Sequence, residues 1–154
     1  SRMLSCVFEG ANNVNHYSAE LREEFSGIVN TVIPKLLGEL QSNGNDLMPS
    51  LVHGNLCDGN TATDLQSGET LVFGASALYA HNEYELGMWR IPGVLFDPSF
   101  CGKYFDEIPP SSPDFHWRYR NILYSLKFNL MWMVKYPAAK SLEQQYVRPF
   151  INLL

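Results

Sequence analysis

The sequence has few charged residues and no long apolar run. Asp, Glu, Lys and Arg make up 18% of its 154 residues, which is below the roughly 25% of an average soluble domain. No apolar run approaches the ~20 residues that span a bilayer, and residues 1–6 lack the apolar core and cleavage site of a signal peptide. These absences predict a cytoplasmic protein without a membrane partner.

The cysteines and the basic residues are too few and too scattered for two classes of function. The three cysteines, Cys6, Cys57 and Cys101, lack metal-ligand spacing, and their odd number favours a reducing compartment over a disulfide framework. The 11 Lys and Arg residues are dispersed and the net charge is -5, whereas nucleic-acid binding needs clustered positive charge. The sequence therefore predicts no nucleic-acid partner and no metal site.

What is abundant is apolar and aromatic side chains. Hydrophobic residues make up 45% of the chain and aromatic residues 13%, which is ample for a packed core. A chain of this length buries about two-thirds of the surface of its unfolded form. We therefore expect residues 1–154 to form one ordered domain.

Apolar residues at helical spacing predict most of the secondary structure. The first helix lies near residues 3–8, and Ser18 caps a second that runs to about residue 40 with a kink at Pro34. Asn82 and Glu85 resemble a capping box that opens a third helix. The other helices are expected from Pro98, from Asp114 (the longest) and from about Ala138.

Two short segments rich in β-forming residues interrupt the helices. They cover residues 50–53 and 70–73, and a polar loop and a turn at residues 66–69 separate them. The pattern predicts a hairpin-like pair of strands on a mainly helical body.

The loop between these strands has a distinctive order of residues. Residues 50–60 read Ser-Leu-Val-His-Gly-Asn-Leu-Cys-Asp-Gly-Asn, and residues 79–87 read Tyr-Ala-His-Asn-Glu-Tyr-Glu-Leu-Gly. With the helix around residues 32–37, these segments resemble the fructosamine kinases, or ketosamine-3-kinases, which belong with the aminoglycoside phosphotransferases. The resemblance extends to about Tyr136. It implies an α+β, mainly helical fold: the C-terminal lobe of a protein-kinase-like fold, with a short β-hairpin at the former catalytic loop.

Two residues depart from the family's pattern at its catalytic positions. The resemblance places Asn55 where the family has the carboxylate that accepts or orients the proton of the attacking sugar hydroxyl. A neutral amide loses general-base assistance worth roughly 10²–10⁴ in rate. Gly74 stands where the family has a metal-binding carboxylate. Asn60 matches a neutral metal ligand, but an amide without an anionic partner holds Mg²⁺ poorly. We expect no cofactor, with ATP and Mg²⁺ only if the chain is a working kinase.

A kinase of this fold also needs a small N-terminal lobe, with a Gly-rich turn over the phosphates and a lysine paired to a glutamate. No Gly-x-Gly run precedes position 53. We therefore expect residues 1–154 to be the large lobe alone, with the small nucleotide-binding lobe absent. Its uncovered apolar surface should bind a protein partner or a second copy of the chain.

Several polar residues have both a functional and a structural interpretation. In the family, His53 supports the catalytic loop by hydrogen bonding, and the alternative is a packed histidine at a strand end. Asp58, His81, Glu83 and Glu85 are candidates for acid–base work in a reused pocket. The structural interpretation is favoured for each of them: Asp58 as a turn residue, the two glutamates as charges near a helix start and His81 as part of a cap.

The favoured function is that of a degenerate ketosamine-kinase-like large lobe without phosphotransferase activity, acting as a binding or interaction protein. One alternative is the repurposed pocket of a non-kinase small-molecule enzyme. A second is a fragment of an ATP-dependent fructosamine or ketosamine 3-kinase. The loss of carboxylates at Asn55 and Gly74 is what sets the first interpretation above the last.

Overall fold

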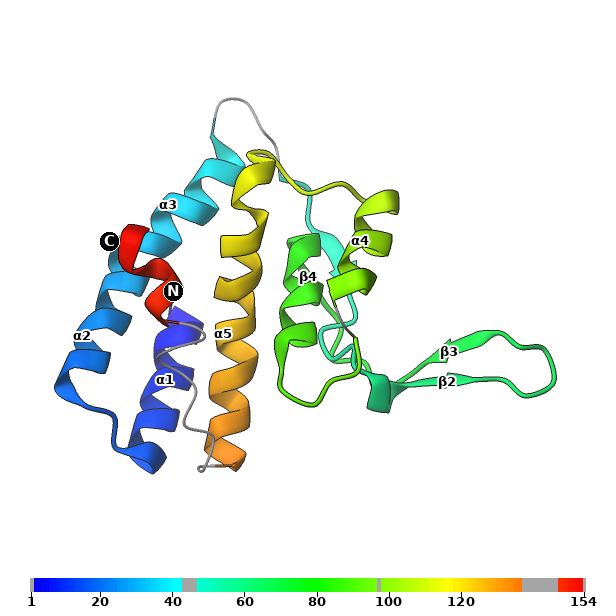
Figure 1. Cartoon of the computed structure of the whole chain (residues 1–154), viewed down its shortest axis with the longest axis horizontal. Coiled ribbons are helices and arrows are strands. Elements are labelled where there is room, and N and C mark those ends of the chain that lie inside the picture. The colour runs from blue at the N-terminus through cyan, green and yellow to red at the C-terminus, as the bar shows by residue number, and fades with distance from the viewer. Residues whose placement is uncertain (1, 43–46, 97, 137–146, 154) are drawn as a thin grey trace.

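The computed structural model describes residues 2–42, 47–96, 98–136 and 147–153, and it consists of helices beside two small antiparallel sheets (Figure 1). This arrangement confirms the predicted mainly helical α+β fold. The α-helices are α1 (Arg2–Asn15), α2 (Ala19–Gly27), α3 (Ile33–Gly38), α4 (Pro98–Glu107) and α5 (Trp117–Lys135). The 3₁₀ helices are Glu39–Gln41, Asp58–Asn60, η4 (Asn82–Arg90), Asp114–His116 and Arg148–Leu153.

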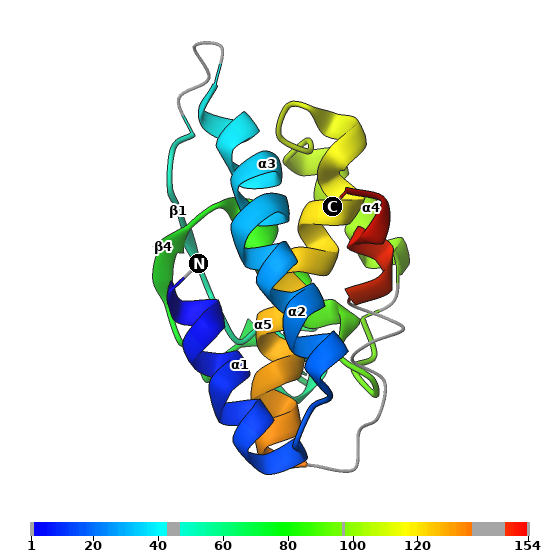
Figure 2. The same cartoon turned by 90° about the vertical axis from the view of Figure 1, so that its left-hand side faces the viewer.

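Helix α5 is the centre of the molecule. Helices α1, α2 and α3 lie on one side of it, and η4, α4 and the strands lie on the other (Figures 1 and 2). Two apolar clusters meet on α5. The larger consists of Leu4, Phe8, Ala11, Leu21, Phe25, Ile28, Val32, Leu36, Leu123, Leu126, Leu130, Met133, Val147 and Phe150. The smaller consists of Val52, Tyr84, Ile91 and Phe128.

The first helices differ in detail from their predicted bounds. α1 continues through residues 12–15 and ends at Asn15, because the following residue, His16, has a φ of 54°. The hydroxyl oxygen of Ser18 accepts a 3.2 Å hydrogen bond from the backbone of Leu21, which confirms the predicted cap. A π-helical turn over residues 28–32 then interrupts the second helix just before Pro34, which has no N–H to continue an α-helical ladder.

Both predicted segments form strands, but they do not pair with each other: each pairs with a further strand that was not predicted. β1 (Ser50–Val52) pairs with β4 (Leu78–Ala80), and β2 (Thr61–Thr63) pairs with β3 (Thr70–Val72). The hairpin is therefore β2–β3, which projects from the helical body (Figure 1). Val52 is buried in the smaller apolar cluster beside Tyr84. That contact favours the pairing of β1 with the strand that leads into η4.

One prediction about the later helices is wrong, and most of another falls outside the described residues. Residues 82–90 form a 3₁₀ helix, and the expected capping box is wrong because no side chain caps its start and Glu85 binds backbone N–H groups elsewhere. Of the final predicted helix, residues 137–146 lie outside the described residues. Pro98 does open α4. Within the described residues, no helix is both long and apolar enough to cross a bilayer.

Candidate functional site

His53 ties the loop of residues 53–60 to the end of β3. The backbone N–H of Asn55 donates to Nδ1 of His53 at 3.2 Å. This contact makes Nδ1 the acceptor, so the neutral ring carries its hydrogen on Nε2. Nε2 then donates to the carbonyl of Phe73 at 3.0 Å. The geometry is that of a loop-supporting histidine, with both ring nitrogens used.

The structure brings together the three positions that resemble the family's catalytic and metal-binding residues. The side-chain amide of Asn55 donates to the carbonyl oxygen of Gly74 at 3.0 Å, and the amide of Asn60 donates to the carbonyl oxygen of Asn55 at 2.7 Å. Gly74 has a φ of +69°, and a Cβ built on it would lie 2.8 Å from Oδ1 of Asn60. The side chain of Asn60 thus occupies the space that a side chain at position 74 would enter.

These three residues do not fit a nucleotide-bound Mg²⁺ ion. They offer amide and carbonyl oxygens, whereas Mg²⁺ in phosphate-transfer sites is held through carboxylates and phosphates. Two of the amide groups are already engaged as hydrogen-bond donors within the loop. Elsewhere in the described part of the chain, no three His, Cys, Asp or Glu side chains form a group that would hold a metal.

Glu85 holds the start of the loop rather than facing a pocket. Glu85 is 6% exposed, and its carboxylate accepts hydrogen bonds from the backbone N–H groups of His53 and Gly54, the latter at 3.1 Å. Gly54 has a φ of +72°, and a Cβ there would lie 2.5 Å from the carbonyl oxygen of Ser76. Gly54 is therefore needed for the turn, because a larger residue would clash and would not readily adopt its positive φ. Glu85 stabilises the same turn through its hydrogen bonds with the backbone of His53 and Gly54.

Glu83 forms a buried ion pair with Arg120, a residue that lies outside the sequence motifs of residues 50–60 and 79–87. Nη2 and Nε of Arg120 each donate to the carboxylate of Glu83 at 2.7 Å. Arg120 also donates to the carbonyl oxygens of Ser111 and Pro113, and the N–H of Ser111 donates to Glu83 at 2.9 Å. Arg120 shares the face of α5 that carries Leu123 and other core residues, and a lone arginine on an apolar face is the signal that predicts such a pair.

His81 belongs to the same buried polar network. Its Nδ1 lies 2.8 Å from the hydroxyl of Tyr124, and its Nε2 lies 2.9 Å from the hydroxyl of Ser111. Burial lowers the pKa of His81, and the nearby carboxylate of Glu83 only partly offsets this effect. Burial also raises the pKa of Tyr124. We name the residues His81, Glu83, Ser111, Arg120 and Tyr124 the His81–Arg120 network.

Asp58 occupies a turn. It opens the 3₁₀ turn Asp58–Asn60, and its carbonyl oxygen accepts a 3.0 Å hydrogen bond from the hydroxyl of Thr61. Its carboxylate accepts a 3.0 Å hydrogen bond from the backbone of Leu95, in the segment after η4. Like Asp58, the carboxylates of Glu83 and Glu85 accept hydrogen bonds from backbone N–H groups of another segment. These contacts fit the structural interpretation of the three carboxylates rather than a role in acid–base chemistry.

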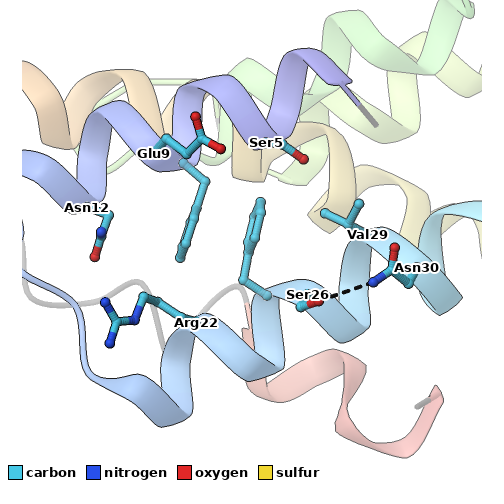
Figure 3. Close-up of a pocket in the computed structure, with 9 residues that line it drawn as sticks. Ser5, Glu9, Asn12, Arg22, Ser26, Val29 and Asn30 are labelled. Carbon is cyan, nitrogen blue, oxygen red and sulfur yellow. Dashed lines mark hydrogen bonds between the residues drawn. The ribbon is translucent and has the colours of Figure 1, made fainter.

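Two cavities lie away from this loop. One, of about 390 Å³, lies between α1 and α2, and polar side chains including Glu9, Asn12 and Arg22 surround it (Figure 3). The other, of about 130 Å³, lies beside the start of α1. Neither is lined by Asn55 or by the four pocket candidates. A reused pocket at those residues stays a prediction.

Comparison with known proteins identifies the family. Residues 11–148 match the fructosamine kinase family. The chain is 36% identical to mouse ketosamine-3-kinase over 86 residues, which are 56% of this chain and 25% of the relative. It is 33% identical to the rice (japonica) chloroplastic protein-ribulosamine 3-kinase over 108 residues, which are 68% of this chain and 30% of the relative.

A probable ketoamine kinase of Synechocystis is 34% identical over 98 residues, which are 62% of this chain and 30% of the relative. The matched part of the chain thus spans between 25% and 30% of the length of these curated relatives. The family match covers the loop of residues 53–60, η4 and all of α5. The chain belongs to the fructosamine kinase family.

Proposed function

We propose that this chain is a large lobe of the fructosamine kinase family that does not transfer phosphate and acts by binding. The observation that carries the proposal is the hydrogen bond from the amide of Asn55 to the carbonyl of Gly74, beside an Asn60 side chain that fills the space at position 74. Asn55, Asn60 and Gly74 are neutral and hydrogen-bond to one another. They stand at positions where phosphoryl transfer needs two carboxylates.

The chemistry of these groups argues against a proton-accepting role. An amide has no useful basicity at pH 7, so the loop lacks the general base that contributes roughly 10²–10⁴ in rate. Its NH₂ group donates to Gly74, which fixes the orientation of the amide. A kinase that kept its metal site without its base would retain nucleotide binding, but here the carboxylate for the metal is missing as well.

A kinase fragment is the alternative that the family itself favours. The curated relatives are named as kinases of ketosamines and ribulosamines, and a working member would use ATP with Mg²⁺. This alternative requires Mg²⁺ to bind beside the amide of Asn60 without the carboxylate that Gly74 replaces. It therefore differs from our proposal in its affinity for Mg²⁺-ATP as well as in phosphate transfer.

Thermal unfolding with added ligands separates these functions. A ligand present at 100 times its Kd stabilises the folded chain by about 2.7 kcal/mol. We expect no shift in Tm with ATP and Mg²⁺. A Mg²⁺-dependent shift with ATP would support the kinase alternative and contradict our proposal. A shift with another metabolite, lost on substitution of His81 or Asp58, would support the repurposed pocket of a non-kinase enzyme.

The surface of the two small sheets is our candidate for protein binding. Large apolar side chains are exposed on it, among them Leu51 (67%), Tyr79 (74%) and Leu65 (98%). Each strand of β2–β3 has one partner among the described strands, so its outer edge is open to pairing with another strand. We propose that this surface binds a polypeptide, with a second copy of the chain as the first case to test. The surface consists of both sheets, β1 with β4 and β2 with β3, and of the loop of residues 64–69.

Light scattering during size-exclusion chromatography tests this surface. We expect a mass above that of the monomer at about 100 µM, and a shift toward monomer when Leu71 on β3 is replaced by Lys. The matched control is Leu95→Lys, an exposed leucine outside both sheets. A wild-type chain that stays monomeric and resists cross-linking at that concentration would contradict self-association.

A further inference from the structure

The smaller cavity is lined mostly by apolar side chains and by one positively charged side chain, Lys127. It holds about 130 Å³ and lies where the start of α1 meets α3, η4 and α5. Five aliphatic or thioether side chains form most of its wall: Met3, Leu4, Ile33, Leu37 and Leu123. Tyr84, Tyr124 and Lys127 complete it. The loop of residues 53–60 contributes no side chain to this wall, so the inference below does not rest on the proposed function.

Lys127 is a cation without an anionic partner in the described residues. Its ammonium donates to the hydroxyl oxygen of Tyr84 at 2.7 Å and lies 4.3 Å from the centre of the Phe128 ring. It lies 5.4 Å from the ring of Tyr84 as well. No carboxylate of the described chain is within ion-pair distance of it. A partly buried ammonium held by aromatic faces and one hydroxyl retains the capacity to bind an anion.

Tyr84 adds a second donor at the same place. Because its oxygen accepts the hydrogen bond from Lys127, its own O–H hydrogen is free to point elsewhere. An anion at the ammonium would thus receive two hydrogen bonds, one from Lys127 and one from Tyr84. A carboxylate, with two oxygens about as far apart as two such donors require, matches this arrangement better than a single halide ion.

The volume limits the apolar part of the ligand to one ring or a short branched chain. A buried apolar cavity of about 150 Å³ binds benzene, and this cavity is of similar size. We propose that it binds a small carboxylate that carries one aromatic ring or a comparable aliphatic group, such as a benzoate-like or phenylacetate-like metabolite. The ring lies against Leu4, Leu37 and Leu123, and the carboxylate pairs with Lys127.

Titration of the unmodified chain with benzoate and with benzamide tests the proposal. The two probes share their ring and differ in charge. A ligand of this size binds with a Kd of about 1 mM or tighter, and pairing with the ammonium should make benzoate bind at least about tenfold more tightly than benzamide. Equal affinities, or no binding of benzoate at about 10 mM, would overturn the proposal.

Two lysine variants test whether the charge of Lys127 causes the tighter binding of benzoate. Lys127→Met keeps the apolar stem and removes the cation, so benzoate should bind at least about tenfold more weakly and no better than benzamide. The matched control is Lys103→Met, an exposed lysine on α4 that lines neither cavity; it should bind benzoate as the unmodified chain does. If Lys127→Met binds benzoate unchanged, the assignment is wrong.

The position of the ligand can be read without any variant. Methyl resonances of Met3 and Leu37 should shift on addition of benzoate because these side chains line the site. The methyl resonances of Val29, which lines the larger cavity between α1 and α2, should stay in place. Shifts confined to Val29 would place benzoate in the other cavity and overturn the proposal, even if Lys127→Met failed to fold.

Discussion

At the scale of single residues, the amide of Asn55 has a role that a carboxylate cannot take over. Asn55→Asp removes the N–H donor to the carbonyl of Gly74. It places a carboxylate oxygen next to the carbonyl oxygen, and the two repel each other. We expect the free energy of unfolding at pH 7 to fall by about 0.5–1.5 kcal/mol. Urea unfolding measures it. A protonated carboxyl can donate again, so the loss should shrink near pH 4; a loss that is the same at both pH values would contradict this account.

Arg120 is the residue whose removal should cost the most. Arg120→Met leaves the carboxylate of Glu83, which is 1% exposed, without its cation. Breaking a buried pair in this way lowers the free energy of unfolding by about 3–5 kcal/mol. Arg118→Met, on the exposed face of the same helix, is the control and should change it by less than about 0.5 kcal/mol.

The coupling between Glu83 and Arg120 is tested by the double variant. Glu83→Leu with Arg120→Met removes both charges, so its loss of stability should be smaller than the sum of the single losses. Additive losses, or an Arg120→Met variant as stable as Arg118→Met, would show that the 2.7 Å contacts of this pair do not carry the stability assigned to them.

His81 should make stability depend on pH. Burial holds its pKa below its ordinary value, which is about 6.5 in an unfolded chain. The unfolded state therefore binds the proton more readily, so this stabilisation is complete above about pH 6.5 and is lost as the pH falls through the folded pKa. His81→Gln should lose less stability than the wild type between about pH 7.5 and 5.5. Identical pH slopes for the two proteins would contradict this role.

At the scale of elements, the close approach of η4 to α5 depends on Gly87. A Cβ at Gly87 would lie 2.8 Å from the backbone carbonyl carbon of Tyr124. Gly87→Ala should therefore destabilise the fold by about 1–3 kcal/mol, because backbone must move. The control is Gly38→Ala at the end of α3, where nothing lies within 4 Å of the added atom. It should be neutral or stabilising by up to about 1 kcal/mol.

Circular dichroism during thermal unfolding compares the two glycine variants directly. Equal Tm values for Gly87→Ala and Gly38→Ala would mean that η4 and α5 are not in the close contact described. A lower Tm for Gly87→Ala alone is the expected result. This contact positions Glu83 and Glu85, and with them the network at Arg120 and the turn at Gly54.

The helices were largely predictable from the sequence because their apolar spacing is strong. The Ser18 cap and the start of α4 at Pro98 follow from local chemistry and are confirmed. The strand pairing was not predictable, because three-residue strands carry too little pattern to choose a partner. The sequence pattern predicts Glu85 as a cap residue, but hydrogen bonds from the backbone of His53 and Gly54 override this local preference.

At the scale of the whole molecule, α5 joins the helical side to the strand side. It contributes Leu126 and Leu130 to the larger apolar cluster and Phe128 to the smaller one. The resemblance in the sequence located Asn55, Asn60 and Gly74, and the structure places them within hydrogen-bonding contact of one another. The contacts of Arg120 with Ser111 and Pro113 depend on the folded path of a loop, which no local pattern encodes.

Our main proposal is that this member of the family does not transfer phosphate. Its most direct test is the rate of ATP-dependent phosphorylation of a ketosamine, with saturating Mg²⁺, by the longest translated form that contains this chain. Mouse ketosamine-3-kinase serves as the positive control. Loss of the general base alone predicts a rate at least about 10²–10⁴-fold lower than that of the control. A rate within about tenfold of the control would contradict the account.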